Sequence, residues 1–192
     1  MKNLMIVCLL LTLLTAGCSR QQPKVVLELF LTSPSNDRTL AYGVRTADLS
    51  RDSSDPDSVA HGLMPSDCRP VILHSTSWRW EKNGTLILTY LAFSEDSKCE
   101  SAEPSRLAWN ELLPPQTTDP KKPRPAVIRQ QEVLAHAVRH ITFLVRYSQD
   151  RRVATVLSPQ SLRFFQSMCG QLAGRYETAK EFADCSGIDN SK

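Results

Sequence analysis

Residues 71–93, VILHSTSWRWEKNGTLILTYLAF, contain the clearest secondary-structure pattern of the chain. Two runs rich in β-branched, aromatic and other apolar residues, 71–80 and 85–93, lie on either side of Asn83-Gly84. Asn-Gly between such runs is the strongest short-range signal for a β-hairpin, because both residues tolerate the positive φ of a tight turn. The sequence therefore predicts two antiparallel strands joined by a two-residue turn.

This turn determines the expected pairing of side chains across the hairpin. Trp80 is expected opposite Ile87, and Trp78 opposite Thr89. Successive side chains of a strand point to opposite faces, so this pairing also determines which residues share the apolar face. They are Ile72, His74, Thr76, Trp78, Trp80, Ile87, Thr89, Leu91 and Phe93. We expect this face to form the core, with both tryptophans inside it; the alternative is a platform on which a ligand stacks.

Further strands and helices are predicted on both sides of the hairpin. Residues 24–31 and 38–46 predict strands, and residues 127–147 predict a long helix. Ser158-Pro159 predicts the start of another helix, with Ser as N-cap and Pro at the first helical position. We therefore expect an α+β fold, in which an antiparallel sheet with a central Asn-Gly hairpin is packed by two or three C-terminal helices.

Two stretches have the composition of polar loops. Residues 48–70 are rich in Ser, Asp and Pro, and residues 95–125 are rich in Pro and end in a polyproline-like segment. Within the second stretch, residues 107–113 predict a turn of helix that docks Trp109. We expect residues 24–192 to form a single globular domain, since this length is sufficient for one core.

Residues 1–17, MKNLMIVCLLLTLLTAG, are almost wholly apolar after Lys2. The run is shorter than the roughly 20 apolar residues that a membrane-spanning helix needs. Its positive start, apolar middle and small residues at the end are typical of a signal peptide. The final residues and the cysteine that follows, Leu14-Thr15-Ala16-Gly17-Cys18, resemble the lipobox of bacterial lipoprotein precursors, with Thr15 where Leu is commonest.

This resemblance implies the chemistry of the N-terminus. In that family, the cysteine, here Cys18, receives a diacylglycerol, residues equivalent to 1–17 are removed, and the new terminus is acylated, palmitate being a typical chain. Residues 18–23 would then form a short lipidated tether. Ser19 in place of Asp implies the outer membrane, facing the periplasm, if the cell is Gram-negative. The alternative is an ordinary secretory signal that leaves Cys18 as a thiol.

A second resemblance covers residues 74–79, 88–92 and 136–145. These segments are similar to short bacterial proteins, cyanobacterial ones among them, that have no assigned activity. This resemblance implies nothing about function.

The charge of the chain excludes one class of partner. The formal net charge is +3, and it falls to +2 without residues 1–17. This balance is too small to indicate nucleic-acid binding or electrostatic attraction to a membrane. We expect no nucleic-acid partner and no cofactor. The expected partners are the lipid bilayer, through the Cys18 lipid, and a protein of the cell envelope.

Four cysteines follow Cys18, and an even number in an exported protein indicates two disulfide bonds. They are Cys68, Cys99, Cys169 and Cys185. The hairpin pairing places Cys68 near Cys99, and a C-terminal tail that folds back would bring Cys185 to Cys169. The alternative is four separate buried thiols.

Three histidines are the candidates for chemistry. His136 and His140 share one face of the predicted helix, and His74 lies on the hairpin face against which that helix should pack. One interpretation is that they are partly buried core residues. The other is a metal or acid–base site that all three form. No GxSxG motif accompanies His74, and the sequence leaves open whether the protein is an enzyme.

We therefore expect a membrane-anchored, extracytoplasmic lipoprotein with a binding or structural role in the cell envelope. A histidine-based metal site or hydrolase in the same compartment is the alternative.

Overall fold

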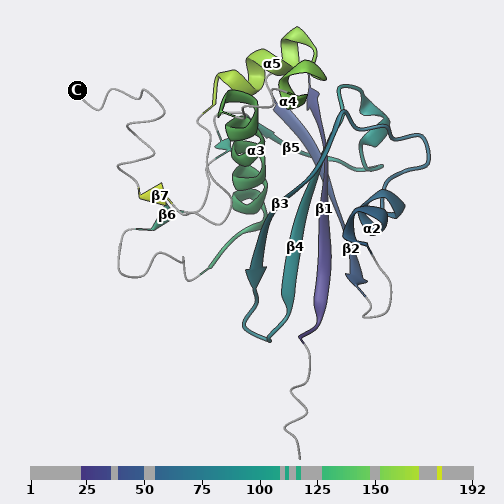
Figure 1. Cartoon of the computed structure of the whole chain (residues 1–192), viewed down its shortest axis with the longest axis vertical. Coiled ribbons are helices and arrows are strands. Elements are labelled where there is room, and N and C mark those ends of the chain that lie inside the picture. Colours follow the sequence, from purple (N-terminus) through teal and green to yellow (C-terminus); the bar gives the residue numbers. More distant parts are fainter. Residues whose placement is uncertain are drawn as a thin grey trace, which may run out of the picture.

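The computed structural model has an α+β fold, which confirms the expected fold class (Figure 1). The structure describes residues 23–35, 39–49, 55–108, 111–112, 116–117, 127–147, 152–168 and 177–178. Across its five-stranded sheet, the strands follow the order β3 (Ile72–Trp80), β4 (Leu86–Phe93), β1 (Val25–Ser35), β2 (Thr39–Leu49) and β5 (Ser105–Ala108).

β1 is the central strand and is covered on both faces. Leu27 and Leu29 are buried on one face, and Phe30 is buried on the other. A strand buried on both sides is apolar at nearly every position, as β1 is. β1 pairs with β2 in antiparallel register from Val25↔Leu49 onward. The predicted strands at 24–31 and 38–46 are confirmed, and both extend further toward their C-terminal ends.

The prediction of a polar loop over residues 48–70 is wrong, because α2 (Pro56–Gly62) forms inside it. Asp55 caps this helix, with its carboxylate accepting a hydrogen bond of 3.0 Å from the Ser58 N–H. Pro56 occupies the first helical position, where its missing N–H costs nothing. Ala60 of α2 is buried against β1, so the helix covers one face of the sheet.

β3 and β4 form an antiparallel pair, but this pair lies at the edge of the sheet, and the prediction that it is central is wrong. The chain passes from β2 through α2 to the far edge, so β4 returns beside β1 and runs parallel to it. The sheet is therefore mixed, not wholly antiparallel as predicted.

The predicted two-residue Asn-Gly turn is also wrong. The Glu81 N–H donates to the Thr85 carbonyl at 2.8 Å, and the Gly84 N–H donates to the Glu81 carbonyl at 3.0 Å. Three residues therefore lie between Glu81 and Thr85, and Gly84 adopts a φ of 79°. This is the left-handed conformation that closes a three-residue hairpin loop. Trp80 consequently pairs with Leu86.

Short elements interrupt residues 95–125, the stretch predicted to be a polar loop with one turn of helix inside it. They are η1 (Ser97–Cys99), β5, which pairs with β2, and β6 (Gln116–Thr117), which pairs with β7 (Glu177–Thr178). The predicted turn of helix over 107–113 is wrong at its start, where residues 107–108 belong to β5. Trp109 lies outside the described residues.

The predicted C-terminal helices are confirmed. α3 (Gln130–Tyr147) matches the predicted helix at 127–147, and α5 (Pro159–Gln166) begins after Ser158. The Ser158 hydroxyl accepts a hydrogen bond of 3.3 Å from the Ser161 N–H, as an N-cap should. The short helix α4 (Arg152–Thr155) lies between them.

The larger core lies between the sheet and the C-terminal helices. Phe93 of β4 meets Phe165 of α5 edge-on, with ring centroids 5.0 Å apart and planes at 63°. This arrangement is favourable because the positive ring edge contacts the negative ring face. A smaller core lies under α2 on the opposite face of the sheet. The sheet thus buries apolar side chains on both faces, whereas two large aromatic side chains of its β3 edge, Trp78 and Trp80, are exposed.

Candidate functional site

An extra residue in β3 decides which of its side chains reach the surface. Ser75 pairs with Tyr90, whereas Ser77 pairs with Thr89, so Thr76 forms a β-bulge. Thr76 is buried, and its hydroxyl donates a 3.2 Å hydrogen bond to the Thr89 carbonyl. A single extra residue moves every later side chain of a strand to the opposite face of the sheet.

The bulge turns Trp78 and Trp80 outward. Their side chains are 63% and 40% exposed, so the prediction that they pack in the core is wrong. Across β4, Trp78 pairs with Leu88 and Trp80 pairs with Leu86, and both leucines are half-buried. These four side chains lie on the sheet face that α2 covers elsewhere. We call Trp78, Trp80, Leu86 and Leu88 the tryptophan surface.

Arg79, between the two tryptophans, points to the opposite face and forms a buried ion pair. Its Nη1 and Nη2 atoms donate to the Glu28 carboxylate at 2.9 and 3.1 Å, and Nη1 also donates to the Thr89 hydroxyl at 3.1 Å. The side chains of Arg79 and Glu28 are only 15% and 9% exposed. Burial lowers the pKa of Arg79, but its bonds to Glu28 and Glu81 outweigh this effect and raise the pKa. The bidentate pair joins β3 to β1 and holds Arg79 inside while the tryptophans point outward.

The tryptophan surface lies at the end of the sheet where β1 begins. The Leu86 N–H donates to the Lys24 carbonyl at 2.8 Å, and Val25, Leu86 and Trp80 form one row across β1, β4 and β3. Adjacent strands are about 4.8 Å apart, so Val25 and Trp80 are separated by about 10 Å. Figure 1 shows the start of β1 and the β3–β4 turn at the same lower end of the molecule, with α4 and α5 at the upper end.

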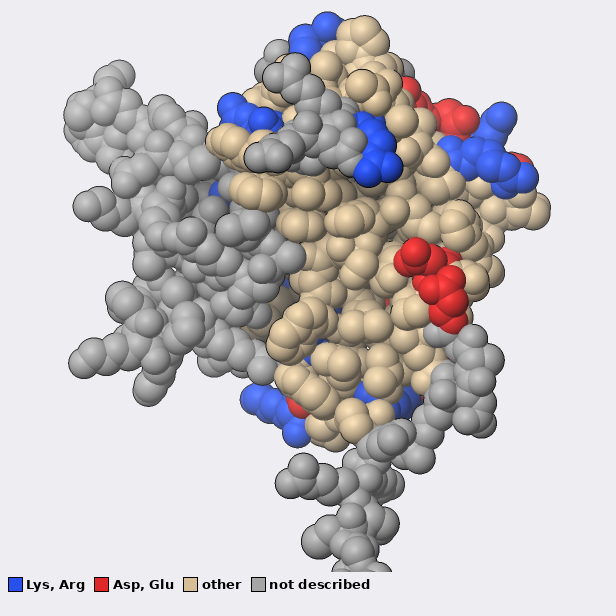
Figure 2. All heavy atoms as spheres, viewed as in Figure 1, with Lys and Arg blue, Asp and Glu red and all other residues tan. Residues whose placement is uncertain are grey.

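Charged groups around the tryptophan surface nearly balance. Lys24 forms an exposed ion pair with Asp48 at 3.0 Å, Arg79 and Glu81 are paired at 3.0 Å, and Lys82 is exposed in the turn. Figure 2 shows a broad uncharged area in the middle of the molecule, with Lys and Arg toward its upper and lower ends and acidic residues on the right. Any partner of the tryptophan surface is therefore recognised mainly through apolar and aromatic contacts.

The opposite end of β3 borders a cavity of about 430 Å³, lined among others by His61, Met64 and Leu73. Beside β3 on the same face, the Tyr90 hydroxyl donates a 2.8 Å hydrogen bond to the Asp57 carboxylate. Burial and this bond to Asp57 raise the pKa of Tyr90 to about 12. The Tyr90–Asp57 hydrogen bond links β4 to α2.

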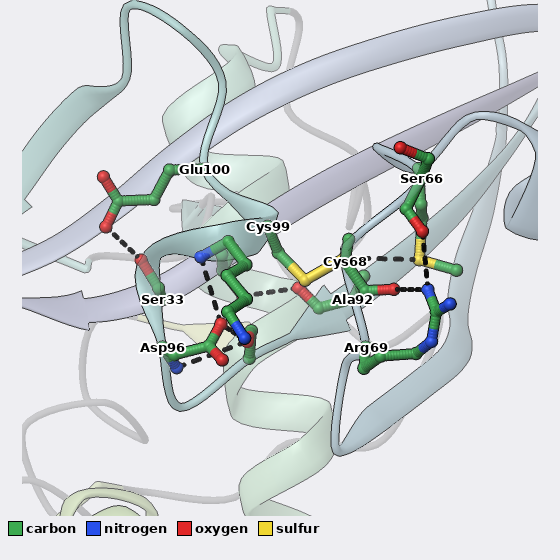
Figure 3. Close-up of a disulfide and its surroundings, with 12 residues drawn as sticks. Ser33, Ser66, Cys68, Arg69, Ala92, Asp96, Cys99 and Glu100 are labelled. Atoms are coloured by element: carbon green, nitrogen blue, oxygen red, sulfur yellow. Dashed lines mark hydrogen bonds between the residues drawn. A yellow bond between two sulfur atoms is a disulfide. The ribbon is translucent and has the colours of Figure 1, made fainter.

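The predicted Cys68–Cys99 disulfide is present, with Cα atoms 4.5 Å apart (Figure 3). Both residues are buried. The strand register differs from the predicted one, and the bond instead joins the segments that precede β3 and follow β4. Close to it, the Ser33 hydroxyl donates a 2.6 Å hydrogen bond to the Glu100 carboxylate. The disulfide therefore closes the end of the β3–β4 pair that is remote from the tryptophan surface.

Two of the three predicted histidines come together. The His74 and His140 rings stack with centroids 5.5 Å apart and planes at 14°, and His136 is buried one turn earlier on α3. Burial lowers the pKa of His74, and the charge of Asp57 opposes this effect without cancelling it. Stacked rings present their faces to each other, whereas a metal binds the ring nitrogens. Within the described part of the chain, no three His, Cys, Asp or Glu side chains form a group that could hold a metal ion.

Other predicted site residues lie outside the described residues. They are Cys18, Cys169 and Cys185, so lipidation and the second disulfide stay predictions. Sequence reasoning missed the exposure of Trp78 and Trp80, and no local signal marks the bulge that causes it. It also missed α2, although Asp55-Pro56 is a recognisable helix start.

The chain matches no protein-family model and no curated protein in the comparisons. In the segments that the structure describes, no helix is both long enough and apolar enough to cross a membrane.

Proposed function

We propose that the protein is a lipoprotein of the cell envelope, held on a membrane by a lipid on Cys18 and exposed to an extracytoplasmic compartment. The observation that carries this proposal is the sequence Leu14-Thr15-Ala16-Gly17-Cys18 directly after a short apolar run. One acyl chain binds a bilayer only marginally, whereas two or more chains anchor a protein stably. In a Gram-negative cell, Ser19 after the cysteine favours the outer membrane, facing the periplasm.

The Cys68–Cys99 disulfide supports this compartment. Disulfides form and persist in oxidising environments outside the cytoplasm. Both cysteines are buried, so the bond is protected from reductants by the fold itself.

The tryptophan surface supports a binding or structural role. Exposed tryptophans are unusual on a protein that contacts only water, and tryptophan is enriched where proteins meet partners. Trp78 and Trp80 present such a pair beside half-buried leucines. The proposed partners are the bilayer, through the Cys18 lipid, and a protein of the envelope.

Mass spectrometry of the protein purified from membranes tests the anchor. We expect a mature chain that begins at Cys18, carries diacylglycerol and an acyl group, and incorporates labelled palmitate. Cys18→Ser should abolish the labelling and block processing or release the protein from membranes. Cys8→Ser, the same substitution within the predicted signal peptide, is the matched control and should leave the lipid in place. An unmodified Gly17-Cys18 junction in the mature protein contradicts the proposal.

A further inference from the structure

We infer that the tryptophan surface rests in the headgroup region of the bilayer that holds the Cys18 lipid; this inference depends on the proposed lipid anchor. The tether between Cys18 and the fold is short. Lys24 is six positions after Cys18, and a fully extended chain of this length spans at most about 20 Å. The start of β1 therefore lies within about 20 Å of the membrane, whatever path the tether takes.

The tryptophan surface lies at the tethered end of the fold. The Lys24 carbonyl accepts the Leu86 N–H, so the tether joins the sheet directly beside β4. Trp80 is in the same row as Val25 and Leu86, about 10 Å from Val25 across two strand spacings. Trp78 lies one row further along the same face. The tryptophan surface is thus closer to the anchor than α4 and α5, which lie at the other end (Figure 1).

The side chains of the tryptophan surface suit a membrane–water interface. An indole ring has an apolar body and a polar N–H, and tryptophan is accordingly enriched at membrane–water interfaces. Leu86 and Leu88 extend the apolar area beneath the rings. The nearby charges are largely paired, as Lys24 is with Asp48, so apolar and aromatic contact rather than charge is the source of the attraction. Val156, another exposed apolar side chain, directly follows α4, which lies at the opposite end of the molecule in Figure 1.

This contact orients the domain. With the tryptophan surface on the bilayer, the end with the Cys68–Cys99 disulfide and the cavity beside Leu73 point away from the membrane into the aqueous compartment. The cavity is then the part of this face that stays accessible to soluble partners.

Tryptophan fluorescence of the full-length lipidated protein tests the inference. The protein is reconstituted in vesicles of phosphatidylethanolamine and phosphatidylglycerol in which a fraction of the acyl chains is brominated near the headgroup. We expect the bromines to quench the emission, and Trp78→Phe with Trp80→Phe to remove most of the quenched component. The matched control adds Val156→Trp to this double variant, which places an indole at the remote end, and its added emission should not be quenched. Circular dichroism verifies that each variant folds, and the Trp78→Phe and Trp80→Phe single variants provide the same comparison if the double variant does not.

The outcomes separate the inference from the proposed function. Equal quenching in the wild type and the double variant overturns the inference, as does quenching of the indole at position 156. The inference is also overturned if, in the absence of vesicles, the emission shifts to shorter wavelength as the protein concentration rises. Such a shift would mean that the surface binds a second copy of the chain. If the mass shows a lipid on Cys18 and the protein stays on the vesicles, such results leave the proposed function intact. If Cys18 carries no lipid, the proposed function itself fails.

Discussion

Reduction of the Cys68–Cys99 disulfide should markedly lower the free energy of unfolding of this domain. The bond closes a loop with a sequence separation of 31. The chain-entropy relation for a loop of that length gives about 12 cal/mol/K, or about 3.7 kcal/mol at 25 °C, from restriction of the unfolded chain. For a domain of this size, the loss corresponds to a decrease in melting temperature of about 7–15 °C.

The assay needs a chain in which this pair is the only source of thiols. A protein that starts at Ser19 and carries Cys169→Ala and Cys185→Ala meets this condition. Its unfolding in urea is measured with and without reductant. Replacement of Cys68 and Cys99 by Ala in the same background is the control, because this variant should match the reduced protein and be insensitive to reductant.

Two results would refute the reasoning. One is a difference below about 1 kcal/mol between the oxidised and reduced proteins, which would mean that the bond does not restrict the unfolded chain as calculated. The other is a non-reducing peptide map without a Cys68–Cys99 crosslink, which would remove the bond itself.

Three further predictions concern titration, the buried ion pair and the turn. Because burial lowers the pKa of His74 below its ordinary value of 6.5, the unfolded state takes up the proton first, so stability should decrease as the pH falls through that value. His74→Phe should flatten this pH dependence in thermal melts. An unchanged slope of stability against pH would contradict the role of His74. Arg79→Met should cost about 3–5 kcal/mol in urea unfolding because it leaves Glu28 buried and unpaired. Adding Glu28→Leu should restore part of that loss. If the changes in unfolding free energy caused by the two substitutions simply add, the pairing is contradicted. Gly84→Ala should cost about 1–2 kcal/mol because of its positive φ. The control is Gly62→Ala, because a Cβ atom at Gly62 meets no neighbouring atom, and it should change stability by less than about 1 kcal/mol. Equal losses of stability in the Gly84→Ala and Gly62→Ala variants would contradict a cost from the positive φ of Gly84.

Local patterns predicted much of the secondary structure. The apolar alternation of residues 24–31, the periodicity of residues 127–147 and the cap at Ser158 each involve residues close in sequence, and the structure confirms all three. Hydrophobic periodicity and capping hydrogen bonds operate over a few residues, so they can be recognised without knowledge of the fold. The same local reasoning, applied to Asp55-Pro56, would have found α2.

The candidate site depended on contacts that no local pattern contains. Thr76 forms the bulge, and the ion pair that holds Arg79 on the buried face joins it to Glu28, 51 residues away in the sequence. A strand of the same composition without the bulge would place Trp78 and Trp80 inside, as the alternation predicts. The parallel pairing of β1 with β4 likewise depends on the path of the chain through α2.

The sequence by itself determined the fold class and the positions of the main strands and helices, because each follows from composition, periodicity or short-range geometry. The pairing of Cys68 with Cys99 was predicted because both lie beyond the ends of two adjacent strands, although the strand register used to predict it differs from the observed one. Only the tertiary structure decided the strand order and the face on which the tryptophans emerge. The physical reason is that the side-chain period of a strand is two residues. One inserted residue, selected by a contact with a distant strand, is then enough to exchange the buried and exposed faces.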